Sequence, residues 1–318
     1  MKRALLVGID EYENFPSLGG CVNDVAALTP LLARHEDASV NFDCQARTSA
    51  SGQILRDQLL SAIDGLLAPG ADVALFYFAG HGAAPENSDV TLVTSDGTRQ
   101  SPGIKLSELL TQVHSSQVGE VLVILDCCFS GGAGGLPQLG SAAAILRPGL
   151  SMLTASRADQ PSAETAEGRG LFSTYLGGAL DGGAADVLGR VTVAGLYAYL
   201  TESFGAWEQR PTLKANIDRL HDLRQCAPAV PLDDLRRLPQ LFTDPGAELH
   251  LDPSYEPTAE PRGDPHEADF AVLQHCRAAK LVEPVEAEHL YFAAMESTAC
   301  RLTPLGRHYR QMAAQNRL

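Results

Sequence analysis

The sequence has few basic residues and no long apolar run. Of its 318 residues, 24 are Lys or Arg and 39 are Asp or Glu, so the formal net charge is −15. This balance argues against a general role on nucleic acid or on an acidic membrane, because binding to phosphate depends on Lys and Arg. No apolar run approaches the eighteen or so residues of a membrane span. The apolar run in MKRALLVGIDEY ends at Asp10, too early for a signal peptide. We therefore expect a cytoplasmic protein.

The usual motifs for metals and nucleotides are also missing. The seven cysteines show no CxxC spacing and the histidines no HExxH pattern, so we expect reduced, mostly buried thiols and no metal site. The stretch GGAGGLP lacks the Gly-Lys-Ser/Thr of a phosphate loop, and Pro137 stands where a dinucleotide fingerprint needs glycine. The sequence therefore predicts no cofactor.

Short apolar runs alternate with amphipathic stretches up to about residue 216. The runs RALLVGI, VNFDCQA, DVALFYFAG, VLVILD, LSMLTAS and RPTLKAN predict strands, and residues 22–34, 53–67, 104–114, 170–180 and 192–207 predict helices. Strands that alternate with helices imply a mostly parallel sheet with helices on both faces. The predicted fold class is α/β, with a first domain at residues 1–225.

The remaining residues have a different composition. Residues 226–266 carry eight prolines and eight acidic residues, which predicts an extended linker or wrapping segment. In residues 267–318, two stretches with helical spacing enclose the strand-like EHLYFAAM and CRLT, which predicts a small winged-helix-like module. Its last eighteen residues hold four arginines and no acid. Both a solvated helix face and a site for nucleic acid would use them.

Two predicted strands end in residues that can do chemistry. LFYFAGHG places His81 at the end of one strand, and VLVILDCCFSGG places Cys127 and Cys128 at the end of another. The carboxyl ends of strands face the ligand crevice in open α/β sheets, so we expect the imidazole and a thiol to meet there. Because side chains alternate along a strand, Asp126 and Cys128 should share one side. Either residue alone also fits buried structure, but the joint pattern favours catalysis.

Six motifs in combination make residues 1 to about 220 resemble the caspase-like cysteine peptidases of family C14, most closely the metacaspase-like bacterial members. They are ALLVGIDEY, LGGCVNDVAAL, FYFAGHG, LDCCFSGG, LTASRADQPSAE and GLFSTYLGGAL. The resemblance implies a caspase-like fold with Cys128 as nucleophile and His81 as its base. It also implies an oxyanion hole formed by the backbone N–H groups of Gly82 and Cys128.

Two acidic residues match positions where metacaspases line the pocket for the residue before the scissile bond. These are Asp24 and Asp126, and the resemblance adds Cys21 and Ala79 to the same wall. Two carboxylates suit arginine or lysine and would repel aspartate. By residue type alone, Asp24 or Asn23 equally suits the N-cap of a helix.

Calcium-dependent metacaspases carry a cluster of aspartates, and only Asp96 is a candidate member here, because Gly135 stands where another acid is expected. A Ca²⁺ ion takes about six to eight oxygen ligands, so one carboxylate is a poor site. We therefore expect no dependence on calcium.

A cytoplasmic protease that cuts after arginine needs control. Arg147, Arg157 and Arg169 are candidate processing sites, and Arg169 is favoured because Gly170 follows it, whereas Pro148 follows Arg147. Caspase-like proteases of bacteria often belong to stress or antiviral defence systems, so the resemblance implies a zymogen with an upstream sensor or protease as partner.

Three functions stay open from the sequence. The first is a cysteine endopeptidase acting on proteins with exposed Arg or Lys. The second is a regulatory protein whose C-terminal module binds a partner or DNA, with the caspase-like part as a scaffold. The third is a Cys-His acyl transferase or amidase that acts on a thioester or amide metabolite.

Overall fold

The computed structural model describes residues 1–83, 89–127, 129–130, 146–155, 168–205, 211–219, 221–260 and 264–318. Two compact units divide the chain. The first consists of Met1–Ala185 with Arg190–Cys226, and the second of Asp186–Gly189 with Ala227–Leu318.

A six-stranded sheet in the order β11-β9-β7-β3-β1-β2 forms the centre of the first unit. The strands are β1 (Lys2–Gly8), β2 (Phe42–Thr48), β3 (Val73–Ala79), β7 (Glu120–Asp126), β9 (Leu150–Thr154) and β11 (Thr212–Asn216). The first five run parallel, and only β11 is antiparallel to its neighbour. The α/β class predicted from the alternating apolar runs is therefore confirmed.

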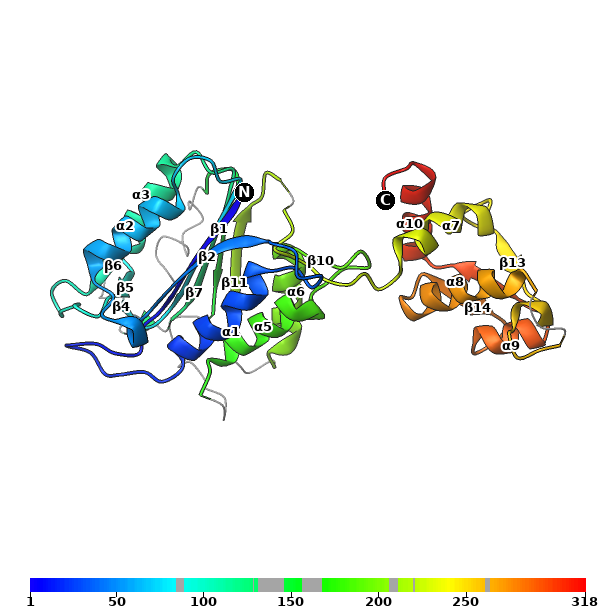
Figure 1. The fold of residues 1–318 in the computed structure, drawn as a ribbon, viewed down its shortest axis with the longest axis horizontal. Helices are drawn as coiled ribbons and strands as arrows, with labels where there is room; N and C mark the ends of the chain where they lie inside the picture. The colour runs from blue at the N-terminus through cyan, green and yellow to red at the C-terminus, as the bar shows by residue number, and fades with distance from the viewer. Residues whose placement is uncertain are drawn as a thin grey trace. The chain divides into compact units, whose positions relative to one another are not determined.

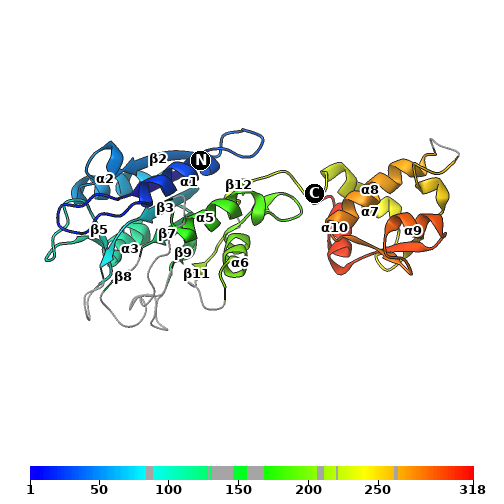
Figure 2. The same cartoon turned by 90° about the horizontal axis from the view of Figure 1, so that it is seen from below.

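Helices cover both faces of this sheet (Figures 1 and 2). One face packs against α2 (Arg56–Leu66) and α3 (Leu106–Ser115), the other against α1 (Cys21–Ala33), α5 (Leu171–Gly178) and α6 (Val193–Ser203). Alternate residues of each strand supply the two cores, as Phe76 and Tyr77 of β3 illustrate. Both faces are buried, which explains why the strands are continuous apolar runs.

Smaller elements extend beyond the ends of β3 and β7 or close the first unit. A four-stranded sheet in the order β6-β5-β4-β8 lies just past the carboxyl ends of the two central strands. Its strands are β4 (Gly82–Ala83), β5 (Thr91–Val93), β6 (Gly103–Lys105) and β8 (Phe129–Ser130). The remaining elements are η1 (Ser49–Ser51), η2 (Ala179–Gly183) and the pair β10 (Arg190–Val191) and β12 (Arg224–Gln225).

The second unit has its own apolar core. Its elements are α7 (Leu232–Leu241), β13 (Glu248–His250), η3 (Pro253–Tyr255), α8 (His266–Ala278), β14 (Val282–Val285), α9 (Leu290–Met295), β15 (Ala299–Leu302) and α10 (Pro304–Ala314). The three strands form an antiparallel sheet in the order β13-β15-β14.

The second unit differs from the sequence expectations in two places. Residues 226–266, expected as an extended segment, contain α7 and contribute Leu235 and Leu238 to the core. Pro231, Pro253 and Pro265 stand where α7, η3 and α8 begin, where proline is tolerated, whereas Pro239 lies inside α7. The EHLYFAAM stretch is helical rather than a strand, because Leu290, Ala293 and Ala294 are buried at helical spacing.

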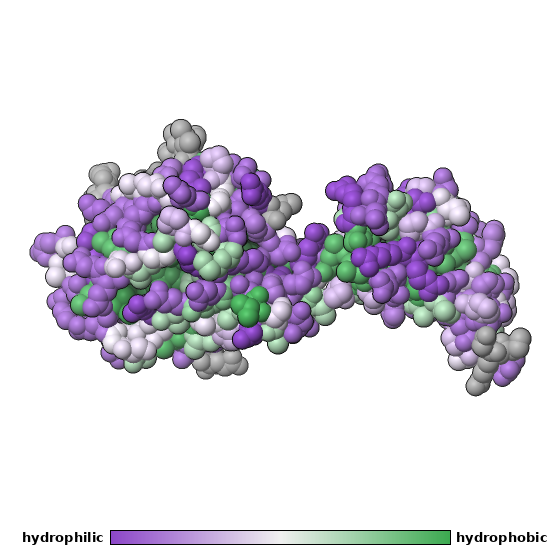
Figure 3. Space-filling view, turned by 45° about the horizontal axis from the view of Figure 1, so that its top comes forward, coloured by the Kyte–Doolittle hydropathy of each residue, from purple (hydrophilic) through white to green (hydrophobic). Residues whose placement is uncertain are grey.

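The surface is largely hydrophilic on the face drawn in Figure 3, with small hydrophobic areas scattered over it. Large apolar side chains that are exposed include Val40 in the first unit and Tyr291, Phe292 and Met295 of α9 in the second. Within the described ranges, no helix combines the length and the apolar character needed to cross a bilayer.

Candidate active site

The carboxyl ends of β3 and β7 lie side by side. The predicted catalytic residues, His81 and Cys128, come just after these two ends. The last pair in the register of β3 and β7 joins Ala79 to Asp126, and the backbone N–H of Gly80 donates to the Asp126 carbonyl at 3.3 Å. Pairing resumes beyond this point, where Gly82 of β4 lies opposite Phe129 of β8. Both pairs join residues 47 positions apart, which is also the separation of His81 and Cys128. Cys128 itself lies outside the described residues.

His81 follows β3 and is held from two directions. Its backbone N–H donates to the Tyr12 hydroxyl at 2.9 Å, and its ring Nε2 lies 2.8 Å from the carbonyl oxygen of Pro16. A carbonyl oxygen only accepts, so Nε2 carries the hydrogen and Nδ1 keeps the free lone pair in the neutral ring. The Pro16 carbonyl therefore orients the imidazole.

No sequence pattern pointed to Pro16, because the group that acts is a backbone carbonyl, which every residue has. The closest indication of this contact is the pair of aromatic residues that pack against His81. The Tyr12 and Phe15 rings lie 4.8 and 6.2 Å from the His81 ring between centroids. These contacts fix the segment that carries Pro16 beside the histidine.

Gly80 is required by the close approach of Tyr12. A Cβ atom at residue 80 would lie 2.6 Å from the Tyr12 hydroxyl oxygen, closer than any real Cβ contact. The same hydroxyl donates to the Ile9 carbonyl at 3.0 Å. Tyr12 thus links the end of β1 to the turn that presents His81.

Asp24 lies in the first turn of α1 and is almost fully buried, with 2% of its surface exposed. The Nε of Arg169 lies 3.3 Å from its Oδ1, and the backbone N–H of Gly170 lies 3.2 Å from both of its oxygens. Burial, and secondly the nearby Asp126, raise the pKa of Asp24 to about 7, although Gly170 and Arg169 favour its charged form.

The helix-cap alternative for Asp24 and Asn23 does not match the structure. Asp10, two residues after β1, caps α1 instead, because its carboxylate accepts from the backbone N–H groups of Cys21 and Val22 at 2.9 and 3.1 Å. The Asn23 side chain donates to the Gly168 carbonyl at 3.1 Å. Asp24 is therefore free of a capping role and points toward the segment that precedes α5.

Asp126 ends β7 and points to the same side of the sheet as Asp24. It is 8% exposed, and its Oδ2 accepts a hydrogen bond from the Ser173 hydroxyl. Burial raises the pKa of Asp126 to about 6, while hydrogen bonds from Ser173 and Tyr77 oppose the shift. Its neighbour Cys127 is buried in the core on the opposite face, as side-chain alternation predicted.

The two carboxylates converge on Gly170. A Cβ atom at this residue would lie 3.0 Å from Oδ2 of Asp24 and 3.1 Å from Oδ2 of Asp126. Cys21 begins the helix that carries Asp24, and burial and the nearby Asp10 and Asp126 raise the pKa of its thiol. Ala79 pairs with Asp126 across the strands. Asp24 and Asp126 thus approach one position, and Cys21 and Ala79 are neighbours of these two residues.

The three arginines considered as processing sites have different surroundings. Arg169 pairs with Asp24, as described above. The Arg147 guanidinium donates to the carbonyls of Val113, Val118 and Pro148 at 2.9 to 3.0 Å. Arg157 lies outside the described residues.

Asp96, the one candidate calcium ligand, is engaged by the protein. Its Oδ1 accepts from the Arg56 backbone N–H at 3.2 Å and from the Thr94 hydroxyl at 2.7 Å. Within the part of the chain that the structure describes, no group of three or more His, Cys, Asp or Glu side chains is arranged to hold a metal ion.

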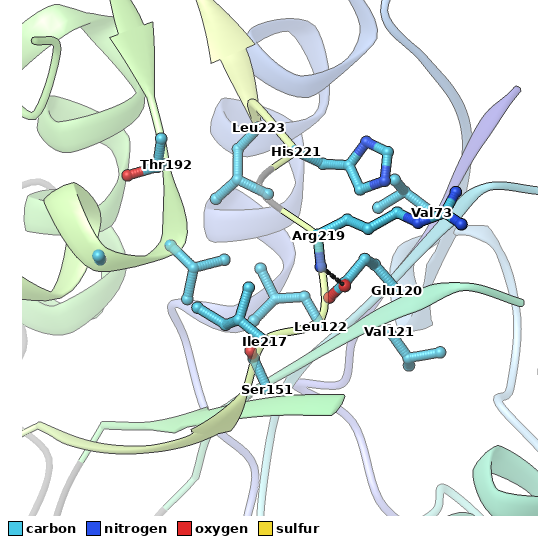
Figure 4. A pocket seen from close by; sticks show the side chains of 12 residues that line it. Val73, Glu120, Val121, Leu122, Ser151, Thr192, Ile217, Arg219, His221 and Leu223 are labelled. Atoms are coloured by element: carbon cyan, nitrogen blue, oxygen red, sulfur yellow. Dashed lines mark hydrogen bonds between the residues drawn. The ribbon is translucent and has the colours of Figure 1, made fainter. Parts of the chain in front are cut away.

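A separate hollow lies at the opposite edge of the sheet (Figure 4). Val73 and Glu120, which begin β3 and β7, line it together with Arg219 and His221. Glu120 accepts from the backbone N–H of Arg219 at 2.6 Å. A seven-residue strand spans about 20 Å, so this hollow is remote from His81 and Asp126.

Comparison with known proteins identifies the family. A family model described as the caspase domain matches residues 1–220. Metacaspase-1B of Neurospora crassa is 28% identical over 208 residues, which are 59% of this chain and 45% of that protein. Metacaspase-7 of Arabidopsis thaliana is 31% identical over 146 residues, or 41% of this chain and 35% of that protein. The matches thus span less than half the length of these relatives.

A solved structure has a similar fold. The crystal structure of protein GSU0716 from Geobacter sulfurreducens aligns with a TM-score of 0.52 and 16% identity, covering 69% of this chain and 94% of that one. Because the caspase-domain model matches residues 1–220, the chain belongs to the caspase-domain family, and it is similar to the metacaspase members of that family.

Proposed function

We propose that this chain is a cysteine endopeptidase that cleaves proteins after arginine or lysine. Cys128 is the nucleophile and His81 is its base. Two observations support this pair. First, the strands before and after residue 128 (β7 and β8) pair in the same register with the strands before and after His81 (β3 and β4). Second, the Pro16 carbonyl holds the imidazole with Nδ1 as acceptor.

In the proposed reaction, His81 Nδ1 takes the thiol proton of Cys128, and the sulfur bonds to the carbonyl carbon of the substrate. A free thiol has a pKa of about 8.5, so the nearby imidazole is needed at neutral pH. The backbone N–H groups of Gly82 and Cys128 hold the oxyanion. As the C–N bond breaks, the imidazolium returns the proton to the leaving amine. Water then adds to the thioester, and the C–S bond breaks to restore the thiol.

The specificity for a cation rests on the carboxylates of Asp24 and Asp126. Both are buried at the same edge of the sheet as His81, and they converge on one position. The observation that carries this proposal is the arginine already present there, because the guanidinium of Arg169 pairs with Asp24. A planar guanidinium suits paired carboxylates better than a point charge does.

The activity is tested with fluorogenic peptides that end in Arg, Lys or Asp before the reporter. We expect turnover of the Arg and Lys peptides, none of the Asp peptide, and none at all by Cys128→Ala or His81→Ala. Cys127→Ala is the matched control, because this thiol is buried on the other face of the sheet. Equal turnover by wild type and Cys128→Ala would refute the cysteine mechanism.

We also propose that the enzyme is a cytoplasmic zymogen of a bacterial stress or antiviral defence system, controlled by an upstream sensor or protease. Processing after Arg169 would require this side chain to leave Asp24, since it is only 21% exposed in the ion pair. Mass spectrometry of wild type and Cys128→Ala should find the cut between Arg169 and Gly170 in the wild type alone. A fully active, intact chain would exclude processing.

A further inference from the structure

Ser173 is a polar residue that contacts both Asp126 and the arginine that pairs with Asp24. It lies in the first turn of α5, and none of its surface is exposed. Its hydroxyl donates to Oδ2 of Asp126, and the hydroxyl of Tyr77 lies 2.6 Å from its Oγ. Ser173 therefore links β7, α5 and β3 directly behind the carboxylate.

The hydrogen bonds of this link have one direction when Asp126 is charged. A carboxylate only accepts, so the single hydrogen of the Ser173 hydroxyl points at Asp126. The Tyr77 hydroxyl, which is 1% exposed, lies against the Ser173 oxygen and also hydrogen-bonds Asp126. Together the two hydroxyls hold Asp126 and favour its charged form.

The backbone of Ser173 faces the cation that the site already contains. Its carbonyl oxygen accepts from the Nη2 of Arg169 at 3.3 Å, while the Nε of the same guanidinium reaches Asp24. Ser173 thus contacts the anion through its side chain and a guanidinium through its main chain.

We propose that Ser173 is a positioning and specificity-determining residue of the arginine pocket. Its hydroxyl holds Asp126 so that the second carboxylate oxygen faces an incoming guanidinium, and its carbonyl is a further acceptor for that group. This inference rests on the proposed function, in which Asp24 and Asp126 receive the residue before the scissile bond. Acceptors at fixed positions match the rigid, planar fork of N–H donors on arginine, whereas the ammonium of lysine is a compact point charge on a flexible stem. The pocket therefore prefers arginine to lysine.

Several charged or titratable groups surround Asp126. They are Asp24 and Cys21 of α1, Tyr77 of β3, and Arg169 immediately before α5. Burial disfavours the charge on Asp126, and the hydroxyls of Ser173 and Tyr77 oppose this effect. Loss of this hydroxyl should therefore raise the pKa of Asp126 and require a higher pH for binding a cation.

The test compares Ser173→Ala with wild type on Arg and Lys peptides across pH 5 to 9. We expect kcat/KM for the Arg peptide to fall about tenfold, mostly because KM rises. The ratio of kcat/KM for the Arg peptide to kcat/KM for the Lys peptide should fall with it. The acid limb of the kcat/KM profile should move up by about one pH unit. Ser203→Ala is the matched control, since this hydroxyl donates only to the Tyr199 carbonyl in α6. It should leave all three readouts unchanged.

Tyr77→Phe provides a second variant if Ser173→Ala does not fold. It removes the donor behind Ser173 and should shift the same readouts in the same direction by a smaller amount. The inference would be overturned if the folded Ser173→Ala variant left the KM, the Arg-to-Lys ratio and the acid limb unchanged. If only Tyr77→Phe folds, the same result in that variant would overturn it. Either result would leave the proposed peptidase intact.

Calorimetric binding of agmatine separates the inference from the proposed activity. Agmatine carries a guanidinium, and binding is measured in Cys128→Ala with and without Ser173→Ala, or Tyr77→Phe as its substitute. A wild type that cleaves no peptide, while agmatine binds and loses affinity about tenfold in the double variant, would refute the peptidase and retain the role of Ser173. Absence of both cleavage and binding would overturn both proposals.

Discussion

The Nε atom of Arg169 lies 3.3 Å from Oδ1 of Asp24, although the two residues are 145 positions apart in the chain. The carboxylate is 3% exposed and the arginine side chain 21%. A buried charge without a partner is costly, and this pair offsets part of the cost of burying Asp24. It also shows a guanidinium bound at the place where the proposed substrate residue would be recognised.

The ion pair should stabilise the fold only when Asp24 is charged. Its pKa is raised to about 7, so the pair is formed above pH 7 and is lost as the pH falls below that value. We expect Arg169→Ala to lower the free energy of unfolding by about 2 to 3 kcal/mol at pH 8.5 and by much less at pH 5.5. Urea denaturation at both pH values measures this. An equal loss at both would show that Arg169 acts by packing alone.

Asp126 should lower the stability of the folded protein at neutral pH. Its pKa is raised from the ordinary carboxyl value to about 6, so between about pH 4 and 6 the folded protein binds a proton that the unfolded chain releases. Its contribution to stability therefore falls as the pH rises through this window, and stays low above it. Asp126→Asn should be more stable than wild type by about 2 kcal/mol at pH 8, with the difference vanishing near pH 4.

The same substitution should abolish recognition of arginine. Asp126 would thus lower the stability of the protein while being required for its function. We expect kcat/KM for Arg peptides to fall by about 100-fold or more, since a charged partner is lost from a buried site. A gain in stability without a loss of arginine cleavage would remove Asp126 from the pocket. Glu202→Gln, an exposed acid on α6, is the control for a change of net charge.

Gly80→Ala should disturb the histidine through Tyr12. The new methyl group would overlap the Tyr12 hydroxyl, which accepts from the His81 backbone. We expect a loss of about 1 to 3 kcal/mol in the free energy of unfolding and a lower kcat. Tyr12→Phe removes the overlapping oxygen, so the double variant should recover part of the stability. Purely additive effects of the two substitutions in thermal unfolding would contradict the proposed clash.

Chelation of divalent metals should leave the activity unchanged. The carboxylate of Asp96 already accepts two hydrogen bonds from the protein, and a calcium ion needs about six to eight oxygens. Peptide hydrolysis measured in EGTA and in millimolar calcium should therefore be the same. Loss of activity in EGTA that calcium restores would contradict this prediction.

Local periodicity was sufficient to predict the six strands of the central sheet and the five described helices that cover it, and to place His81 and Asp126 at the carboxyl ends of neighbouring strands. It did not predict the small four-stranded sheet beyond those ends. It was insufficient in the second unit, where the aromatic residues of α9 favour a strand and tertiary burial at helical spacing decides for a helix. The prolines of residues 226–266 indicated a break in structure, whereas several of them begin elements that pack into the core.

The sequence by itself determined which chemical groups this protein has and at which strand ends they stand, because alternation and turn residues act over a few positions of the chain. Only the tertiary structure decided their partners, since the Pro16 carbonyl, the Asp10 cap of α1, the Ser173 hydroxyl and the Arg169 guanidinium each reach their targets from a separate segment. Contacts between distant segments depend on how strands order themselves in the sheet, and no local pattern records that order.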